Sequence, residues 1–500
     1  MGLAGTAGSG AVGTMLEIGR NCSHLEHADR VAILVENDRY FSIVEKVLER
    51  AERSVTLIGW QFDPRTQLDP INPPLGAAGE VGHQMRRLAR TKPDLKIRLL
   101  VWNSPLPIAA SQGMFPQRAV RWFKKNPVDL RLVKPFSMGA AHHPKVLLID
   151  DKLAFCSGGD ISVDRWDTGQ HLDEDLYRVL PNGAKRKPRH EVVMMVDGGA
   201  ARALAEMSRA AWNWVTGEVP EPVSVDYDPW PEDVTPTLTD VTVGISQTVS
   251  ANSGRGEKRE VEALFLDMIN QAERLIYLEN QYFTSPVIAA AIARRLTEPD
   301  GPEVVLISTG ESPSWFDHAT MDGARSEVLH SLEKADVFGR LSAWHPKTAG
   351  GANIIVHSKV TIIDDRLIRV GSSNLNNRSC GYDTELDVTG EREVPDAAIR
   401  GVRQHLIGHF LGVTDDAYAE AEAETGTVAG AIAALNTTGR MSPISTDRPG
   451  FLGRFTAEYQ IGDPTAPSNA WRPWKRRKLS RHLRQEVEVG LAGLIEDQAE

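Results

Sequence analysis

The sequence contains the stretch HSKVTIID at residues 357–364, and a second copy, HPKVLLID, stands at residues 143–150. Both copies have the pattern His-x-Lys-x4-Asp, and each continues with another aspartate, a basic residue and a leucine. In an extended segment, a His and a Lys two positions apart share one face, and the apolar run after them is typical of a buried strand. Two such strands could meet with both His-Lys pairs converging.

A third His-x-Lys triplet begins at His345 but has Ala352 where the pattern requires aspartate. The bare triplet is therefore a weak signal, and one copy alone fits an ordinary strand histidine near a solvated lysine. The two full copies agree in more than the triplet, because a Gly/Ser-rich quartet follows each at the same distance, at 157–160 and 371–374. Chance rarely preserves this much, so we infer that the pair of copies carries the chemistry.

The order of predicted elements also repeats. A helix and a strand at 40–53 and 55–61 are matched by a helix and a strand at 257–273 and 275–278. We infer an α/β fold of two homologous halves, each with a mixed β-sheet flanked by helices. The predicted parts are a flexible N-terminal segment (1–29), a first half (30–217), a Pro-rich linker (218–256), a second half (257–412) and a C-terminal extension with a basic, Trp-containing tail (413–500).

Composition and charge narrow the range of functions. The 500 residues, with 41% hydrophobic and 25% charged, are typical of a soluble globular protein of two or three domains. The net charge of −11 argues against a protein whose main task is to hold nucleic acid, because Lys and Arg supply most of that affinity. Three scattered cysteines, no secretion signal and no apolar run of about 18 residues predict a cytoplasmic protein without a transmembrane segment.

The residue types in the two copies suit phosphate chemistry. A neutral imidazole is a nucleophile, a protonated imidazole is a general acid, and ammonium groups stabilise phosphate oxyanions. Two histidines and two lysines supply all three roles. The copies contain no carboxylate cluster able to hold Mg²⁺ or Zn²⁺, so we expect no metal in the chemical step and no cofactor.

The paired copies resemble the motifs of the phospholipase D superfamily, over roughly residues 30–412. Other features are similar to the lipid-cleaving, eukaryotic-like branch more than to the short nucleases with one motif. These features are YLENQYF (277–283), GGDISVDRWD (158–167), RHE (189–191) ahead of AWN (211–213), and GSSNLNNRS (371–379). The resemblance implies two halves related by a pseudo-twofold axis, with one active site at their junction.

The resemblance also implies roles for the residues of the motif. His143 would be the nucleophile that forms a phosphohistidine, and His357 the acid that protonates the leaving alcohol and then activates water. The family does not settle this order for every member. Lys145 and Lys359 would bind the non-bridging phosphate oxygens, and Asn374 would donate a further hydrogen bond.

Acidic residues complete the predicted site. Asp150 and Asp364 end the buried strands and are expected to hold the loop that follows each one. Each imidazole needs a carboxylate to fix its tautomer. We expect Glu385 to serve the histidine of the second copy and Glu191 to serve that of the first, with Asp175 as a rival to Glu191.

The chain departs from the family pattern at Asp160, which lies 17 positions after His143 as Asn374 lies 17 positions after His357. An acid cannot copy the role of an amide, so its role stays open. The Gly-Gly before it also sits one position later than in the eukaryotic-like members, and Glu191 replaces the more usual aspartate.

Two classes of function fit the sequence. The first is a phospholipid phosphodiesterase or phosphatidyl transferase, with peripheral contact to an anionic membrane through the basic, Trp-containing tail at 471–484. A plain solvated helix end also fits this tail. The second class is a nuclease or other phosphodiesterase of the same superfamily, which would need a long basic groove. A cardiolipin synthase is a third possibility, although such enzymes usually carry membrane-spanning helices.

Overall fold

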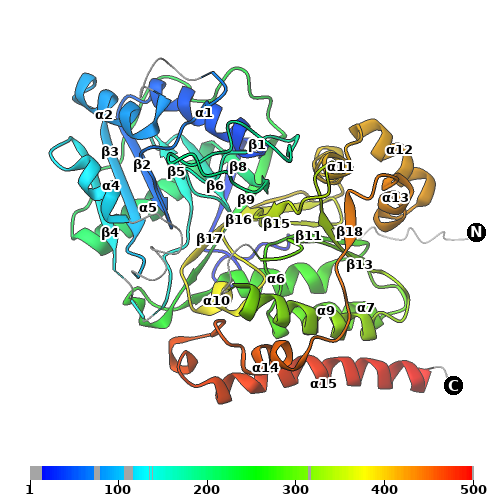
Figure 1. Cartoon of the computed structure of the whole chain (residues 1–500). Coiled ribbons are helices and arrows are strands. Elements are labelled where there is room, and N and C mark those ends of the chain that lie inside the picture. Colours follow the sequence, from blue (N-terminus) through cyan, green and yellow to red (C-terminus); the bar gives the residue numbers. More distant parts are fainter. Residues whose placement is uncertain are drawn as a thin grey trace, which may run out of the picture.

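The computed structural model describes residues 14–72, 79–105, 116–134, 136–137, 139–312 and 317–497. Strands from both halves join in one mixed sheet, with helices on its faces (Figure 1). The α/β class expected from the sequence is confirmed. The two half-sheets are continuous, because β1 (His24–Val35) pairs antiparallel with β9 (Leu238–Val249).

The first half contributes seven strands of this sheet, in the order β4-β3-β2-β5-β6-β8-β1. The outer three are parallel, and the others pair antiparallel. Every residue of β5, β6 and β8 is buried, because helices or loops cover both faces of the sheet there. The bounds are β2 (Ser54–Gly59), β3 (Lys96–Trp102), β4 (Val128–Val133), β5 (Val146–Ile149), β6 (Leu153–Ser157) and β8 (Val192–Val196).

The second half repeats this order and these directions, as β13-β12-β11-β15-β16-β17-β9. Because the strand order is the same in both halves, a pseudo-twofold axis between β1 and β9 relates them. The bounds are β11 (Leu275–Glu279), β12 (Glu303–Ile307), β13 (Leu341–Pro346), β15 (Val360–Ile363), β16 (Leu367–Gly371) and β17 (Glu385–Glu391), with β18 (Met441–Pro443) beside β13 and β10 (Lys258–Arg259) beside β9.

The boundaries of the halves differ from those predicted. The predicted linker 218–256 contains β9, the counterpart of β1, so only its Pro-rich part, 218–237, connects the halves. The first half also begins earlier than residue 30, since β1 starts at His24 and runs along β9. Residues 1–13 of the predicted flexible segment lie outside the described residues.

Helices cover the sheet in a matching arrangement. In α1, apolar side chains three or four positions apart, such as Phe41, Val44 and Leu48, are fully buried against the sheet. One helix from each half, α5 and α11, packs on the central core that both halves share. The bounds are α1 (Asn37–Arg50), α2 (Val81–Thr91), α4 (Pro116–Phe123) and α5 (Gly198–Thr216), then η2 (Ala251–Ser253), α6 (Glu260–Gln271), α7 (Pro286–Thr297), η3 (His318–Asp322), α9 (Gly323–Ala335), α10 (Asn377–Gly381) and α11 (Ala397–Leu411).

The C-terminal extension is mostly helical. Its last helix, α15 (Pro473–Asp497), lies along α7 and α9 and buries Leu483 and Val487 in their core (Figure 1). Among the described residues, no helix has both the length and the apolar character needed to cross a membrane. The other elements are α12 (Asp415–Thr425), α13 (Val428–Leu435), α14 (Phe451–Tyr459) and η4 (Pro467–Asn469).

Candidate active site

The two His-x-Lys copies meet because short parallel pairings cross between the halves. Strand β14 (Ile355–Val356) runs into His357 and pairs with β7 (Arg189–His190) of the first half. The N–H of His357 then donates to the carbonyl of His190 at 2.9 Å. In the symmetric arrangement, the N–H of His143 donates to the carbonyl of Thr384 at 3.0 Å. Each histidine therefore enters the site beside a strand of the opposite half.

This crossing reverses the predicted pairing of histidines and glutamates. Nδ1 of His143 lies 2.8 Å from Oε2 of Glu385, and Nδ1 of His357 lies 2.9 Å from Oε1 of Glu191. The prediction that Glu385 serves His357 and Glu191 serves His143 is wrong. Sequence proximity suggested a partner within each half, whereas the parallel pairings place each histidine beside the segment that carries the glutamate of the other half.

The two glutamates are held differently. Ser372 and Ser379 donate to the two carboxylate oxygens of Glu385 at 2.5 and 2.7 Å, and the contact with His143 is an aligned hydrogen bond. Neither oxygen of Glu191 has an aligned hydrogen bond, and its 2.9 Å approach to His357 is a charge contact of poor angle. The His143 ring is therefore held more firmly than the His357 ring.

Both lysines are buried and lie in equivalent positions. Nζ of Lys145 donates to the carbonyl of His143 at 2.6 Å, and Nζ of Lys359 donates to the carbonyl of His357 at 2.7 Å. Lys145 and Lys359 are 4% and 0% exposed. Because burial disfavours the charged ammonium, the pKa of Lys145 is lowered and that of Lys359 falls to about 7. A bound anion would favour the charged form of both groups.

Burial also keeps the two imidazoles uncharged. It lowers the pKa of His143 and of His357 well below the ordinary value, and the neighbouring lysines add to the effect. The same desolvation raises the pKa of Glu191 and raises that of Glu385 to about 8. A neutral imidazole whose Nδ1 faces a carboxylate leaves Nε2 free to attack an electrophile.

Asp150 and Asp364 hold the backbone, as predicted, but at a different place. Asp150 accepts hydrogen bonds from the N–H groups of residues 52–54, in the turn that leads into β2. Asp364 accepts the equivalent bonds from residues 273–275, in the turn that leads into β11. Each aspartate thus fixes the turn before a neighbouring strand, not the loop that follows its own strand.

Asp160 and Asn374 differ in role as their chemistry requires. One oxygen of Asp160 accepts the N–H groups of Trp60 and Gln61 at 2.8 and 3.1 Å, and the other lies 3.9 Å from Nζ of Lys145. Asp160 therefore positions the loop after β2 and offsets the charge of Lys145. Asn374 is 6% exposed, and its Oδ1 has no hydrogen-bond partner.

Gly158 and Gly159 let the halves approach closely. A Cβ atom at Gly158 would lie 2.6 Å from Cδ of Lys359, and one at Gly159 would lie 2.6 Å from Cδ of Glu191. Such distances are shorter than van der Waals contact allows. The Gly-Gly pair therefore supplies space for the lysine and the glutamate of the site.

Buried polar atoms without hydrogen-bond partners gather at the junction. They include Nε of Arg165 and Nη1 of Arg189, two cations for which the sequence suggested no role beyond the family resemblance. Both are at most 8% exposed. Each atom has only a long charge contact, to Asp164 at 3.6 Å and to Glu191 at 3.9 Å. Buried polar atoms without hydrogen bonds are rare in folded proteins. Asp175, the predicted rival of Glu191, accepts instead the N–H of Tyr177 in a surface loop.

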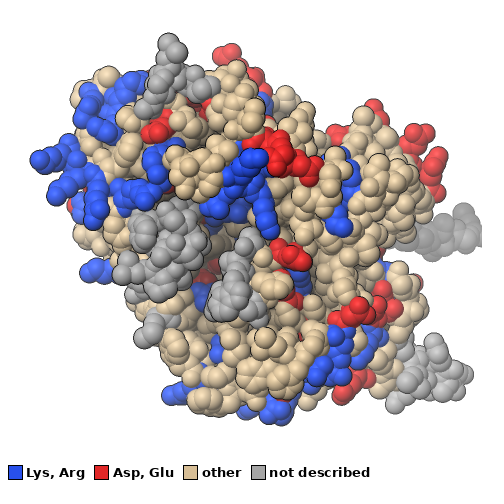
Figure 2. Space-filling model, viewed as in Figure 1, with Lys and Arg blue, Asp and Glu red and all other residues tan. Residues whose placement is uncertain are grey.

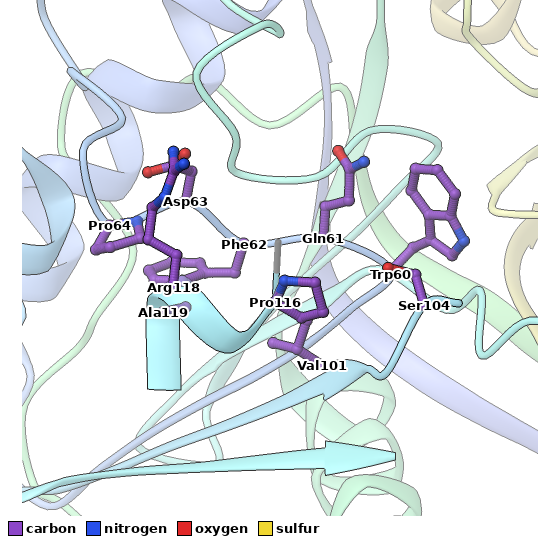
Figure 3. A pocket seen from close by; sticks show the side chains of 10 residues that line it. All are labelled: Trp60, Gln61, Phe62, Asp63, Pro64, Val101, Ser104, Pro116, Arg118 and Ala119. Atoms are coloured by element: carbon purple, nitrogen blue, oxygen red, sulfur yellow. The ribbon is translucent and has the colours of Figure 1, made fainter. Parts of the chain in front are cut away.

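A small pocket opens at the ends of β2 and β3 (Figure 3). The indole of Trp60 meets the His143 ring edge-on, with centroids 6.2 Å apart, and stacks on Trp102. Both apolar and polar side chains line it. They are Trp60, Gln61, Phe62, Asp63, Pro64, Val101, Ser104, Pro116, Arg118 and Ala119.

A separate group of metal-ligand side chains lies behind Glu191 and outside both copies of the pattern. It consists of Glu36, His171, His190 and His409. The sequence did not reveal this group, because its four members are scattered over the chain. Only His190 stood in a recognised feature, the RHE triplet. The expectation that the chemical step needs no metal concerns the paired copies and stays a prediction.

Comparisons with known proteins agree with this site. The family described as "Cardiolipin synthase, PLD-like domain" matches residues 265–405, which include the second His-x-Lys-x4-Asp copy. Phospholipase D alpha 4 from Arabidopsis thaliana is 26% identical over 457 residues, which cover 69% of this chain and 59% of the plant protein. These matches agree with the resemblance of the chain to the phospholipase D superfamily.

Two further relatives extend the comparison. Phospholipase D A from Dictyostelium discoideum is 24% identical over 70% of this chain, and the match covers 32% of that protein. Cardiolipin synthase A from Pseudomonas entomophila is 26% identical over 72% of this chain and 64% of its own length. The match therefore spans only part of each curated relative.

A solved structure shows the same fold over nearly the whole chain. The phosphatidylserine synthase of Haemophilus influenzae superposes with a TM-score of 0.52 and 13% identity, over 94% of this chain and 97% of that one. The phospholipase D-like fold expected from the sequence is thereby confirmed.

Proposed function

We propose that this chain is a phospholipase D-type phosphodiesterase that cleaves the head-group side of a glycerophospholipid through a covalent phosphohistidine. One observation carries the proposal: two neutral imidazoles, each facing a buried glutamate, lie beside two buried lysines at the junction. The names of the phospholipase D and cardiolipin synthase relatives support a phospholipid as the substrate.

In the first step, Nε2 of His143 attacks phosphorus while Lys145 and Lys359 hold the non-bridging oxygens. The bond between phosphorus and the head-group oxygen breaks, and His357 gives that oxygen its proton. The substrate anion raises the pKa of His357, which is low while the site is empty of anion. The aligned hydrogen bond to Glu385 supports His143 as the nucleophile, because it fixes Nδ1–H and leaves Nε2 unprotonated.

In the second step, His357 takes a proton from water, and the oxygen of that water attacks phosphorus. The bond between phosphorus and His143 breaks, and phosphatidic acid leaves. An alcohol in place of water gives phosphatidyl transfer. Asn374, with its amide beside the site, donates to a phosphate oxygen in both steps.

The first test concerns the intermediate. A small primary alcohol added with the phospholipid should yield a phosphatidyl alcohol, in a proportion that rises with alcohol concentration. Two inversions at phosphorus should give net retention of configuration on a substrate that is chiral at phosphorus. An inverted product without alcohol capture would mean direct attack by water and would remove His143 from the role of nucleophile.

The second test concerns the residues. His143→Ala and His357→Ala should each lower turnover by about 10³-fold or more, and the double variant should cost little beyond either one, because both serve one cycle. His345→Ala, in the third His-x-Lys triplet, is the matched control and should keep activity. Near-normal turnover in a folded His143 or His357 variant would contradict a shared site.

The nuclease alternative is tested in the same assays with single-stranded DNA as substrate. On the face in Figure 2, Lys and Arg side chains gather over the first half, at the left, and are mixed with Asp and Glu over much of the rest. The net charge of −11 favours a lipid substrate over a nucleic acid. Cleavage of DNA together with inactivity on vesicles would reverse the choice.

The proposed membrane contact lies on the C-terminal extension. Trp471 and Trp474 are 68% and 63% exposed, and Arg472 and Lys475 beside them are exposed as well. The neighbouring helix α14 exposes Phe451 and Leu452. Indoles and basic side chains together suit the interface of an anionic membrane. We propose peripheral contact through this aromatic and basic surface.

A further inference from the structure

Behind the candidate active site, three imidazoles and one carboxylate share a small buried space. Glu36, His171, His190 and His409 each bring one ligand-type atom, and these atoms lie within 4.8 Å of one another. The first three residues are at most 2% exposed, and the side chain of His409 is 7% exposed. His409 lies on α11 of the second half, so both halves contribute to the group.

The distances within this group fit a tetrahedral ion. Oε1 of Glu36 lies 3.2 Å from Nε2 of His171 and 3.4 Å from Nε2 of His409, and the two Nε2 atoms are 3.1 Å apart. Oε1 of Glu36 also contacts Nδ1 of His190. With bonds of about 2.0–2.1 Å, the ligand atoms of a tetrahedral zinc site lie about 3.3 Å from one another. The three edges among Glu36, His171 and His409 have this length, and the edge from Glu36 to His190 is shorter.

Carboxylates stand behind two of the imidazoles. Nδ1 of His171 lies 3.0 Å from Asp167, and Nε2 of His190 lies 3.0 Å from Glu279. Metal-binding histidines almost always donate their second N–H to such a group, which fixes the tautomer and the direction of the ring. Arg178 in turn donates to Asp167 at 2.8 Å. The surroundings are therefore those of a built ligand set.

The charge of the group is compatible with a divalent cation and equally with two protonated imidazoles. With neutral imidazoles, the carboxylates of Glu36, Asp167 and Glu279 outweigh the single guanidinium of Arg178 by two negative charges. Uncompensated charge in a buried site is costly. A divalent cation cancels it. Two protonated imidazoles would cancel it as well, and the experiment below separates these cases.

Backbone strain at two of the four residues is a further, independent sign. Glu36 has φ 69° and His171 has φ 43°, in the left-handed region that residues other than glycine rarely adopt. Such conformations persist where the surrounding structure imposes them and are common in ligand sites.

We propose that Glu36, His171, His190 and His409 bind one Zn²⁺ that ties α11 of the second half to the first half. His190 connects this site to the chemistry, because its carbonyl accepts the N–H of His357 and the next residue is Glu191. The ion touches neither substrate nor reacting atoms. It positions the segment that carries the carboxylate partner of His357.

The direct test uses the full chain. Protein incubated with excess ZnCl₂ and then desalted should retain about one zinc per chain by elemental analysis. X-ray absorption at the zinc edge should give N and O ligands at about 2.0–2.1 Å. Retention of less than a tenth of this amount would overturn the proposal and leave the group as protonated, hydrogen-bonded histidines.

A pair of variants on one helix locates the ion. His409→Ala should lose the zinc and lower the melting temperature by about 5 °C or more. His405→Ala is the matched control, because His405 is exposed on the same helix and faces Asp415. It should keep the zinc. Full zinc content in folded His409→Ala would overturn the site, and if that variant does not fold, the ligand distances in the wild-type protein still decide.

Discussion

Burial disfavours the charged form of Lys359, and we expect this effect to limit the pH range of the proposed activity. Its pKa is lowered to about 7 by desolvation, so the ammonium is lost as the pH rises through this value. We therefore expect kcat/KM on a soluble phosphodiester to fall above about pH 7. A bound phosphate favours the ammonium, so the fall in kcat should lie at higher pH. A pH series of both constants measures this.

Lys359→Arg separates this cause from others, because a guanidinium does not lose its proton in this range. The variant should lose the alkaline fall even if turnover drops. Lys347→Arg, in the third His-x-Lys triplet, is its control and should keep the wild-type profile. An unchanged alkaline limb in Lys359→Arg would assign the fall to another group.

At this scale the sequence singled out the two histidines that meet at the junction but not their neighbours. The two full copies singled out His143 and His357, since a strand pattern fixes which side chains share a face. The crossed glutamates could not be predicted, because they depend on two-residue strands whose pairing leaves no periodic pattern. The buried Arg165 and Arg189 stood in recognised features, yet only the fold shows that both reach the junction.

At the scale of elements, Asp150 and Asp364 join each motif strand to the turn before its neighbour. Asp150→Ala and Asp364→Ala would each leave three backbone N–H groups without this acceptor. We expect a loss of about 1–3 kcal/mol in the free energy of unfolding for each. Turnover per folded molecule should stay close to wild type. Chemical denaturation and kinetics on the same samples measure both quantities.

Asp175→Ala, in a surface loop, is the control and should change stability little. A loss of turnover at unchanged stability in either variant would give the aspartates a direct part in the reaction. The strands these aspartates serve were predicted well, because their apolar runs are continuous. β9 was missed, because it directly follows the Pro-rich stretch and was counted with it, although β9 itself contains no proline.

At the scale of the whole molecule, the exposed aromatic and basic surface on the C-terminal extension should matter only for a substrate in a membrane. Trp471→Ala with Trp474→Ala should lower activity on anionic vesicles by about 10-fold or more, because interfacial indoles and nearby basic groups give the affinity. Activity on a soluble phosphodiester should not change. Vesicle sedimentation and the two assays measure this.

The control for this surface replaces Val219 and Val394, which are as exposed but lie in other parts of the chain. Their alanine variants should keep activity on vesicles. Equal losses on soluble and vesicle substrates for the Trp variant would mean a structural role. The sequence indicated this tail by composition, whereas the packing of α15 on α7 and α9 needed the fold, because its contacts lie nearly two hundred positions apart.

The crossed glutamates have a consequence for how such a chain comes into being. When only the first half has been synthesised, His143 exists without residue 385, so its ring has no glutamate to orient it. An ancestral protein that consisted of one half would lack this glutamate partner until a second copy folded against it. If either half lost its glutamate, the histidine of the other half would lose its partner. Each half therefore depends on the other for the orientation of its histidine.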